Sequence, residues 1–312
     1  MRFLFFGTPG FARVVLERLL ASRHQAAAVV TAPDKPSGRG RRLKMSEVKE
    51  YALANGLEVL QPKKLKDAGF LEGVKEIDAD LFAVVAFRIL PEKLYSLPRW
   101  GAINLHASLL PRFRGAAPIE RALMAGATTT GVTTFQITKK VDTGDLLLAR
   151  EVPIGENETY EELCPRLADI GADLLAETLD CLEAGTLVAQ PQNPADASPA
   201  PKITTADSLI DWERSAETII NQVRGLAGSA DAYTWLGGRR LKVYRAVRRP
   251  QDNGVGAPGE VVRAERREGL IVATGNGAVS LREVRLEGKK RMMIDAFLNG
   301  VKVTAGTKLT AS

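Results

Sequence analysis

Apolar and polar residues follow two patterns that take turns along the first half of the chain. Short apolar runs, typical of buried strands, occur at Arg2 to Phe6, Ala26 to Thr31 and Asp80 to Ala86. Apolar residues at helical spacing occupy Phe11 to Leu20 and Met45 to Asn55. The alternation predicts βαβ units and an open, mostly parallel α/β sheet.

The same patterns continue into the middle of the chain. Ile103 to His106 and Gly131 to Ile137 read as strands, and Ala117 to Gly126 reads as a helix. A longer helix is predicted over Thr159 to Ala184, where Thr159 and Glu162 have the spacing of a capping box. Because Pro165 falls inside it, we expect a kink or a restarted helix near Cys164.

Periodicity stops at Ala189 to Pro201 (AQPQNPADASPAP), which predicts a linker. One or two helices are then expected, followed by short apolar strands separated by glycine turns, the pattern of a small β-barrel. With 312 residues, two domains are expected. Their predicted bounds are 1–188 for the first domain, 189–206 for the linker and 207–312 for the second domain.

The excess of positive charge is clustered. The net charge is +6 and the pI about 9.3. Five basic residues lie in Lys35 to Lys44 and six lie in Arg239 to Arg249, with no acidic residue in either stretch. Prolines and glycines between Pro33 and Lys44 predict an exposed basic loop without a regular element. A charged loop is commonly only solvated, but two separated clusters favour a polyanionic partner.

Composition also bears on where the protein works. No run of about 18 apolar residues is present, and the amino terminus turns polar and glycine-rich too early for a signal peptide. The two cysteines, Cys164 and Cys181, form no framework, so we expect free thiols. These features predict a cytoplasmic protein without a membrane anchor.

The clearest candidate for chemistry is the stretch Gly101 to Pro118 (GAINLHASLLPRFRGAAP). Asn104 and His106 project from one face of their strand because side chains alternate along it. The following SLLP suits the wall of a partly apolar pocket. Asp142, in the turn of KKVDTGD, is the natural carboxylate partner for His106.

Other chemistries can be drawn from the same residues. A zinc site would need three or four ligands, which the two histidines and separated cysteines do not supply, so no metal is expected. A serine hydrolase could use Ser108, His106 and Asp142, but Ser108 lacks the G-x-S-x-G elbow. A dinucleotide site at GTPGFA lacks the full G-x-G-x-x-G pattern, and a tight turn feeding a helix explains the same residues.

Two of these stretches together, NLHASLLPRFRGAAPIERAL and the later GVTTFQITKKVDTGDLL, resemble the methionyl-tRNA formyltransferase family. The resemblance extends to nearly the whole chain through four further segments, PDKPSGRGRRLK, PAPKI, LEGKKRM and FLNG. The resemblance implies a Rossmann-like formyltransferase sheet and an OB-like carboxy-terminal barrel. It also implies that Asn104, His106 and Asp142 are catalytic, that 10-formyltetrahydrofolate is the formyl donor, and that initiator methionyl-tRNA is the acceptor. No stable protein partner is implied, and we expect a monomer.

The resemblance also assigns binding residues. It places folate against two segments that follow strands, and at Phe87-Arg88 this chain departs from the family's commoner Tyr-Gly. The implied folate-binding residues are Ser108, Leu109, Leu110, Pro111, Phe87, Arg88, Ile89 and Leu90. The implied tRNA-binding residues are Arg39, Arg41, Arg42, Lys44, Lys202, Arg239, Arg240, Lys289, Lys290 and Arg291.

Formyl transfer to an amine requires stabilisation of negative charge on the formyl oxygen. We expect Asn104 and His106 to face that oxygen and Asp142 to orient His106. Three alternatives stay open: another folate-dependent formyltransferase, a formyltetrahydrofolate hydrolase, and a non-catalytic RNA-binding protein. The basic segments favour tRNA over a small acceptor.

Overall fold

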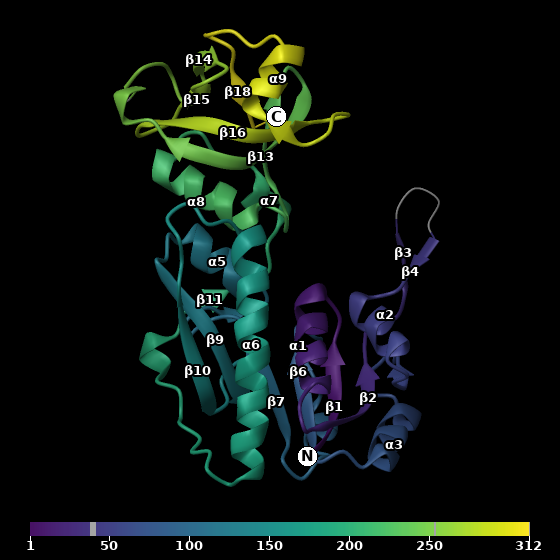
Figure 1. The fold of residues 1–312 in the computed structure, drawn as a ribbon. Coiled ribbons are helices and arrows are strands. Elements are labelled where there is room, and N and C mark those ends of the chain that lie inside the picture. Colours follow the sequence, from purple (N-terminus) through teal and green to yellow (C-terminus); the bar gives the residue numbers. More distant parts are fainter. Residues whose placement is uncertain (38–41, 253, 312) are drawn as a thin grey trace. The chain divides into compact units, whose positions relative to one another are not determined.

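The computed structural model describes residues 1–37, 42–252 and 254–311. The chain divides into two compact units. The N-terminal unit comprises Met1–Pro118, Thr129–Pro153 and Cys164–Ala200, and the C-terminal unit comprises Ile119–Thr128, Ile154–Leu163 and Pro201–Ser312. Each unit contains its own sheet (Figure 1).

The described residues of the N-terminal unit form a seven-stranded sheet in the order β10-β9-β7-β6-β1-β2-β5. Strands β7, β6, β1, β2 and β5 run parallel, and at one edge β9 pairs antiparallel with β7 and β10 pairs antiparallel with β9. The bounds are β1 (Arg2–Gly7), β2 (Gln25–Val30), β5 (Val59–Leu60), β6 (Leu81–Val85), β7 (Ala102–His106), β9 (Thr129–Gln136) and β10 (Leu146–Pro153). The predicted α/β class is therefore confirmed.

The strands are buried because their apolar runs face helices on both sides. Phe3, Leu4, Phe5 and Phe6 of β1 are fully buried, as are most residues of β6. The helices of this unit are α1 (Gly10–Leu20), α2 (Glu47–Ala54), α3 (Ala68–Ile77), α4 (Glu92–Tyr95) and most of α6 (Tyr160–Glu183). β1 lies in the middle of the parallel strands, between β2 and β6, so the chain reverses direction across the sheet there. Ligands of such sheets bind beyond the carboxyl ends of the strands.

The stretch between Pro33 and Lys44 is more regular than we predicted. Strands β3 (Lys35–Ser37) and β4 (Arg42–Lys44) pair as an antiparallel ladder, with Lys35 opposite Lys44 and Pro36 opposite Leu43. The prediction of a loop without regular structure was therefore wrong for these residues. Proline is tolerated because each strand of an isolated pair is an edge strand, where a missing N–H leaves no ladder bond unmade.

Helix α6 is continuous from Tyr160 to Glu183, so the predicted restart near Cys164 does not occur. Only half of the predicted capping box forms: the Glu162 carboxylate accepts from the Thr159 backbone N–H, but the Thr159 hydroxyl also donates to that carboxylate, and the Glu162 N–H donates to the Thr159 carbonyl instead. Pro165 lies in the second turn and removes only one hydrogen bond of the helix. Apolar residues on one face continue past it into the core, among them Leu163, Leu167, Leu175 and Leu179.

In the C-terminal unit, strands follow the order β14-β15-β16-β13-β12-β18, with β17 beside β16 and all pairs antiparallel. A bridge between Glu260 and Lys308 joins the two ends of this path. The ring closes into the small barrel that the strand pattern predicted. The strands are β12 (Ala232–Leu236), β13 (Arg239–Arg248), β14 (Val261–Glu265), β15 (Gly269–Ala273), β16 (Ala278–Leu286), β17 (Met292–Met293) and β18 (Leu309–Thr310).

Inward-facing apolar residues and two helices fill this barrel unit. The helices α8 (Ala216–Leu226) and α9 (Ile294–Gly300) contribute Ile219, Val223 and Phe297 to the buried cluster. Along β13 the inner residues Leu241 and Val243 are fully buried. The alternate residues of β12 and β13 consequently lie on the outer face of the barrel. Two short helices complete the unit, α5 (Pro118–Met124) and α7 (Thr205–Ser208).

Candidate active site

The end of β7 carries the two predicted polar residues on one face. His106 is buried, with 5% of its surface exposed, whereas Asn104 is partly exposed. In the part of the chain that the structure describes, the Asn104 amide makes no hydrogen bond. The Asn104 amide, whose donors and acceptor are unused, therefore lies two residues before the buried imidazole of His106 on the same face of β7.

The ring of His106 is oriented by the main chain of Phe113. Nε2 of His106 lies 2.8 Å from the Phe113 carbonyl oxygen. A carbonyl only accepts, so Nε2 carries a proton and donates it. This contact fixes the ring and leaves Nδ1 as the nitrogen that is available to a reacting group.

Phe113 has an unusual backbone that places its carbonyl there. Its φ is +58°, in the left-handed region that a bulky residue seldom adopts. The Phe113 N–H donates to Oγ of Ser198 at 2.9 Å, and its side chain is buried. Packing and hydrogen bonds on both sides therefore hold a strained residue in place so that it contacts His106.

Asp142 comes to His106 from a distant part of the sheet. β9 ends with Gln136 opposite Ile103, near the start of β7, yet the following loop brings Oδ2 of Asp142 to 3.8 Å from Nδ1 of His106. The loop therefore returns along the face on which Asn104 and His106 lie. Oδ2 also accepts a hydrogen bond from the Gly115 N–H at 2.8 Å. The 3.8 Å separation from Nδ1 is too long for a hydrogen bond, so Asp142 and His106 interact there only electrostatically.

The Asp-Thr-Gly turn is shaped by Gly144 and held by Gln192. A Cβ on Gly144 would lie 1.7 Å from the carbonyl oxygen of Gln136, so no other residue fits there. The Gln192 amide donates to the carbonyl oxygens of Asp142 at 3.1 Å and Gly144 at 2.7 Å. Its oxygen accepts two hydrogen bonds from Arg114, at 3.1 and 2.6 Å. Gln192 thus connects the loop of Asp142 to the segment that follows Phe113.

These contacts come from the segment that the sequence marked as a linker. Gln190 bridges to Leu146, and Pro199–Ala200 forms β11, which pairs with β8 (Arg114–Gly115). Sequence reasoning missed Gln192, Ser198 and Phe113 as residues of the site. A single glutamine or serine in a proline-rich segment gives no signal of such a role, because its partners lie far away along the chain.

The SLLP residues line the turn after β7 as buried or partly buried groups. Ser108 is fully buried, and its hydroxyl donates to the Arg112 carbonyl at 2.7 Å. Because the hydroxyl is engaged in this hydrogen bond, Ser108 is a poor candidate for the nucleophile of a serine hydrolase. Leu110 is 7% exposed and is joined to Pro111 by a cis peptide bond, while Leu109 and Pro111 are partly exposed.

The segment Phe87 to Leu90 leaves β6 beside this turn, because β6 and β7 pair in parallel and end together. The structure thus brings both predicted folate-binding segments to neighbouring strand ends. Arg88 donates to the carbonyl oxygens of Pro62 and Lys63, and its guanidinium lies over the Phe87 ring. Burial lowers the pKa of Arg88. Ile89 is 75% exposed, whereas Leu90 belongs to the apolar core.

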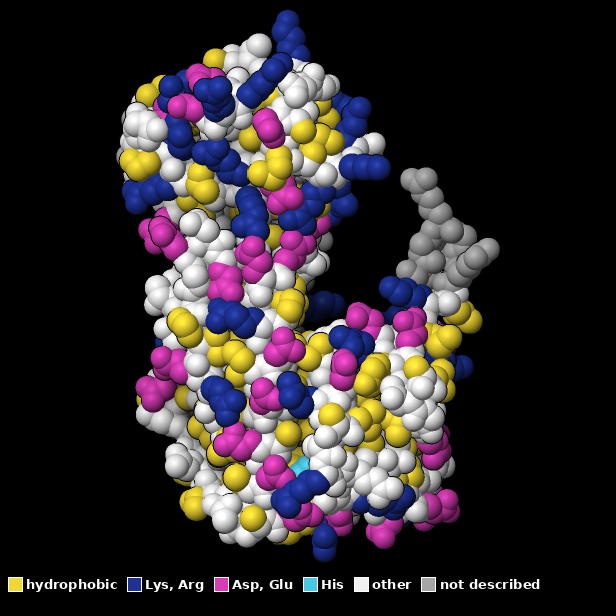
Figure 2. All heavy atoms as spheres, in the orientation of Figure 1, with side chains coloured by type: hydrophobic (Ala, Val, Ile, Leu, Met, Phe, Trp, Pro, Cys, Tyr) yellow, Lys and Arg dark blue, Asp and Glu magenta, His cyan; other side chains and the backbone are white. Residues whose placement is uncertain are grey.

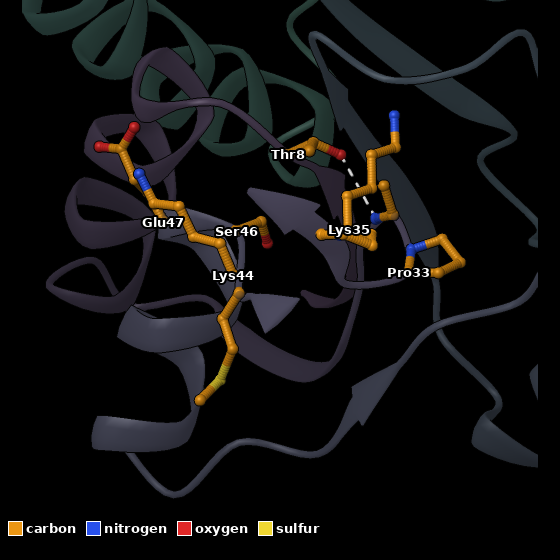
Figure 3. A pocket seen from close by; sticks show the side chains of 9 residues that line it. Thr8, Pro33, Lys35, Lys44, Ser46 and Glu47 are labelled. Carbon is orange, nitrogen blue, oxygen red and sulfur yellow. Dashed lines mark hydrogen bonds between the residues drawn. The ribbon is translucent and has the colours of Figure 1, made fainter. Parts of the chain in front are cut away.

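A cavity of about 400 Å³ lies beyond the ends of β1 and β2, apart from the predicted catalytic residues (Figure 3). On one side of the cavity, the Thr8 hydroxyl accepts a 3.4 Å hydrogen bond from the Ala32 N–H. Figure 3 shows Lys35 beside Thr8 and Pro33, whereas Ser46 and Glu47 come from the opposite wall. The lining is Thr8, Ala32, Pro33, Lys35, Pro36, Lys44, Met45, Ser46 and Glu47.

The predicted tRNA-binding residues differ in how far their charges are neutralised. Lys44, Lys202, Arg239, Arg240, Lys289 and Lys290 are exposed. Arg291 instead forms ion pairs with Glu283 and Glu161, which raise its pKa. Arg39 and Arg41 lie outside the described residues, and Arg42 belongs to β4. Figure 2 shows many Lys and Arg side chains on the surface of the C-terminal unit.

Among the described residues, no group of three or more His, Cys, Asp or Glu side chains is arranged to hold a metal ion. Within the same residues, no helix is long and apolar enough to cross a membrane.

Comparison with known proteins identifies both parts of the chain. Residues 1–179 match the formyl transferase family model, and residues 202–302 match the model of the formyl transferase C-terminal domain. A methionyl-tRNA formyltransferase of Symbiobacterium thermophilum is 46% identical over 99% of this chain and 95% of its own length.

Solved structures share the fold at lower identity. Methionyl-tRNA formyltransferase from Clostridium thermocellum has a TM-score of 0.56 and 17% identity, and the match covers 80% of this chain and 94% of that one. HypX from Aquifex aeolicus, in complex with tetrahydrofolic acid, has a TM-score of 0.66 and 20% identity over 97% of this chain and 48% of that one. Together with the two family models and the close relative, these matches confirm the resemblance, and the chain belongs to the methionyl-tRNA formyltransferase family.

Proposed function

We propose that this protein transfers the formyl group of 10-formyltetrahydrofolate to the amino group of initiator methionyl-tRNA. The observation that carries the proposal is the combination at the end of β7: an unengaged Asn104 amide, a buried His106 with one free ring nitrogen, and Asp142 at 3.8 Å from that nitrogen. The name of the relative, at 46% identity, supports formyl transfer and methionyl-tRNA as the acceptor.

The fit of the donor rests on the same strand ends. Partly exposed apolar residues, Leu109, Pro111 and Phe87, lie beside the polar groups at the ends of β6 and β7. Such a mixture of apolar wall and few polar groups suits a flat heterocycle that carries a reactive carbonyl. Bound there, the folate would supply an activated formyl group.

The residues of the chain then have separate roles in the transfer. The Asn104 amide donates a hydrogen bond to the formyl oxygen, where negative charge develops, and one such donor contributes roughly 3 to 4 kcal/mol to lowering a barrier. Nδ1 of His106 is the second donor, and the Asp142 carboxylate lies 3.8 Å from this nitrogen. Asp142 is also placed to take a proton from the attacking ammonium. Phe113 and Gln192 are positioning residues.

The tRNA would contact the exposed basic residues. We assign catalysis to residues 1–188 and RNA binding mainly to residues 207–312, with Lys44, Arg39, Arg41 and Arg42 contributing from the first domain. In the second domain we assign phosphate contacts to Lys289, Lys290 and Arg239, and a further RNA contact to Arg240; all four side chains are exposed. Arg291 is less suited, because two carboxylates already neutralise it.

The test is formyl transfer from 10-formyltetrahydrofolate to methionyl-tRNA, with free methionine and uncharged tRNA as parallel acceptors. We expect N-formylmethionyl product on the aminoacylated tRNA alone. Release of formate without this product would identify a hydrolase, and RNA binding with neither product would identify a non-catalytic RNA-binding protein. A preference for a small amine would identify another folate-dependent formyltransferase.

A further inference from the structure

The outer face of the barrel carries an arginine that lies over two aromatic rings. Tyr233 and Trp235 stand two residues apart on β12 and therefore share a face, and Trp235 is directly opposite Arg240 of β13. The Arg240 guanidinium carbon is 4.6 Å from the Tyr233 ring centroid and 5.3 Å from that of Trp235. The two rings meet edge to face, with centroids 6.4 Å apart.

The inner neighbours explain why these rings lie outside the core. Burial alternates along β12, where Ala232, Thr234 and Leu236 are buried and the two aromatic residues between them are partly exposed. An aromatic pair on the outer face of a strand does not contribute to the core of the barrel. Its covering group is a charged side chain, which keeps the site accessible to solvent.

Arg240 also differs in its electrostatics from three neighbouring cations, Lys242, Arg245 and Arg249. Lys242 forms an ion pair with Asp231 at 2.8 Å, and Arg245 forms one with Glu162. Arg249 is paired with Asp252 and Glu268. Within the described residues, the Arg240 guanidinium has neither an ion pair nor a hydrogen bond. Its charge is held in place by the rings and is left unneutralised.

Further cations surround this arginine. β13 begins beside the end of β16, because Leu241 pairs with Leu286, and the Glu287 N–H donates to the Arg240 carbonyl at 2.8 Å. The start of β13, with Arg239, therefore adjoins the segment after β16 that contains Lys289 and Lys290. Glu287 brings one carboxylate, which accepts from the Arg240 N–H at 3.3 Å. The local excess of positive charge favours a polyanion.

We propose that Tyr233, Trp235 and Arg240 form a stacking platform for one unpaired base of the bound RNA, with the neighbouring lysines on its phosphates. A guanidinium plane supported by aromatic rings is a surface on which a base stacks. Stacking of this kind tolerates any base, because each has a π-face. The proposal rests on the proposed function in taking tRNA as the partner, and it adds that this contact uses a base as well as the backbone.

The test separates base stacking from charge by changing both partners. One ligand is an eight-nucleotide single-stranded RNA, and the other is the same strand with abasic riboses, which keeps every phosphate. The variants are Arg240→Lys, which keeps the charge and loses the plane, and Trp235→Leu, which removes one ring. Arg248→Lys is the control, because Arg248 is exposed on the same strand and, among the described residues, lies over no ring.

We expect the parent protein and Arg248→Lys to bind the normal strand about tenfold more tightly than the abasic strand, the lower part of the range for one stacked base. Arg240→Lys and Trp235→Leu should bind both strands equally, at the affinity of the abasic strand. Equal affinity of the parent for the two strands would overturn the proposal. So would a loss in Arg240→Lys that is the same for both strands, because charge geometry would then explain it.

The proposed function is tested separately in the same variants. With methionyl-tRNA, Arg240→Lys should raise KM by about tenfold and leave kcat unchanged. Absence of formyl transfer by the parent protein would contradict the proposed function, but it would leave the comparison of normal and abasic RNA binding unaffected. Normal transfer with an unchanged KM in Arg240→Lys would instead overturn the platform for the natural partner alone. Thermal unfolding of each variant shows whether the barrel remains folded.

Discussion

The chemistry of the site depends on which nitrogen of His106 is free. Nε2 is engaged with the Phe113 carbonyl at 2.8 Å, so Nδ1, which lies 3.8 Å from Asp142, is the nitrogen left for a substrate. The arrangement separates two tasks. A backbone carbonyl orients the ring, and the Asp142 carboxylate, at a longer distance, acts through its charge. Asp142 therefore lies close to Nδ1 without occupying this nitrogen in a hydrogen bond.

Replacing His106 by alanine should remove a donor that acts in the transition state. We expect kcat to fall by about 10²- to 10⁴-fold, the usual contribution of a positioned acid or base, with little change in the KM for tRNA. Steady-state kinetics with methionyl-tRNA measure both constants. Turnover equal to that of the parent would exclude His106 from the mechanism.

Gln192→Ala tests whether the turn of Asp142 needs its clamp. The substitution removes hydrogen bonds to two carbonyls of the turn and to Arg114. Because Asp142 would lose its fixed position, we expect kcat to fall by about ten- to a hundredfold, while the KM for tRNA stays near its parent value. Gln190→Ala is the control, since its side chain is exposed. A rise in KM with unchanged kcat would assign Gln192 to substrate binding instead.

At the residue level, the sequence was informative where one short stretch contained the signal. The alternation of Ile103 to His106 predicted that Asn104 and His106 share a face, and the structure agrees. The approach of Asp142 to His106 was also expected. The roles of Phe113, Gln192 and Ser198 could not be predicted, because a backbone carbonyl has no sequence signal and the other two act across long separations along the chain.

At the level of helices and strands, burial of a charge makes one helix sensitive to pH. Glu120, in the first turn of α5, lies where burial raises the pKa of its carboxyl. A raised pKa means that the folded protein holds this proton more tightly than the unfolded chain does. The carboxyl therefore favours folding below its ordinary pKa, and this contribution is lost as the pH rises through the folded value.

Glu120→Gln should consequently stabilise the protein at neutral pH. The amide carries no charge, so its burial avoids the cost of a desolvated carboxylate. We expect the melting temperature at pH 7.5 to rise by about 2 to 4 °C, which corresponds to roughly 1 kcal/mol in a domain of this size. The gain should vanish near pH 4, where the native carboxyl is protonated. A gain of equal size at both pH values would show that charge burial is not its cause.

The outcome for helices and strands follows the strength of their apolar patterns. β1 and β6 are almost fully buried, and their apolar runs predicted them well, as the shorter apolar stretches did for β2 and β7. The β3–β4 ladder was missed, because Lys35 to Ser37 and Arg42 to Lys44 contain too few apolar residues to show a period. β12 was not predicted either. Its outward-facing residues Tyr233 and Trp235 are aromatic, so the sequence shows no alternation of apolar and polar residues there.

At the level of the whole molecule, net charge is a poor guide to RNA binding, because many cations are already paired. The net charge of +6 counts Arg245 and Arg291 equally with Lys289 and Lys290. The two arginines each have carboxylate partners, whereas the lysines are exposed. A cation without a carboxylate partner can neutralise a phosphate and release its counterions without first breaking an ion pair. The sequence identified the clusters, and the structure shows which members remain available.

A salt titration distinguishes the two kinds of cation. Each lysine that contacts a phosphate contributes about 1 to the slope of log(kcat/KM) for tRNA against log salt concentration. Lys289→Ala combined with Lys290→Ala should therefore lower the steepness by about 2, and adding Lys44→Ala should lower it by about 1 more if the same RNA meets both basic clusters. Arg150→Gln is the control, because Arg150 is already paired with Glu177 at 2.6 Å, and its slope should equal that of the parent. A parental slope in the double variant would remove the end of the barrel from the RNA interface. A full effect of the double variant with none from Lys44 would confine phosphate binding to the C-terminal unit.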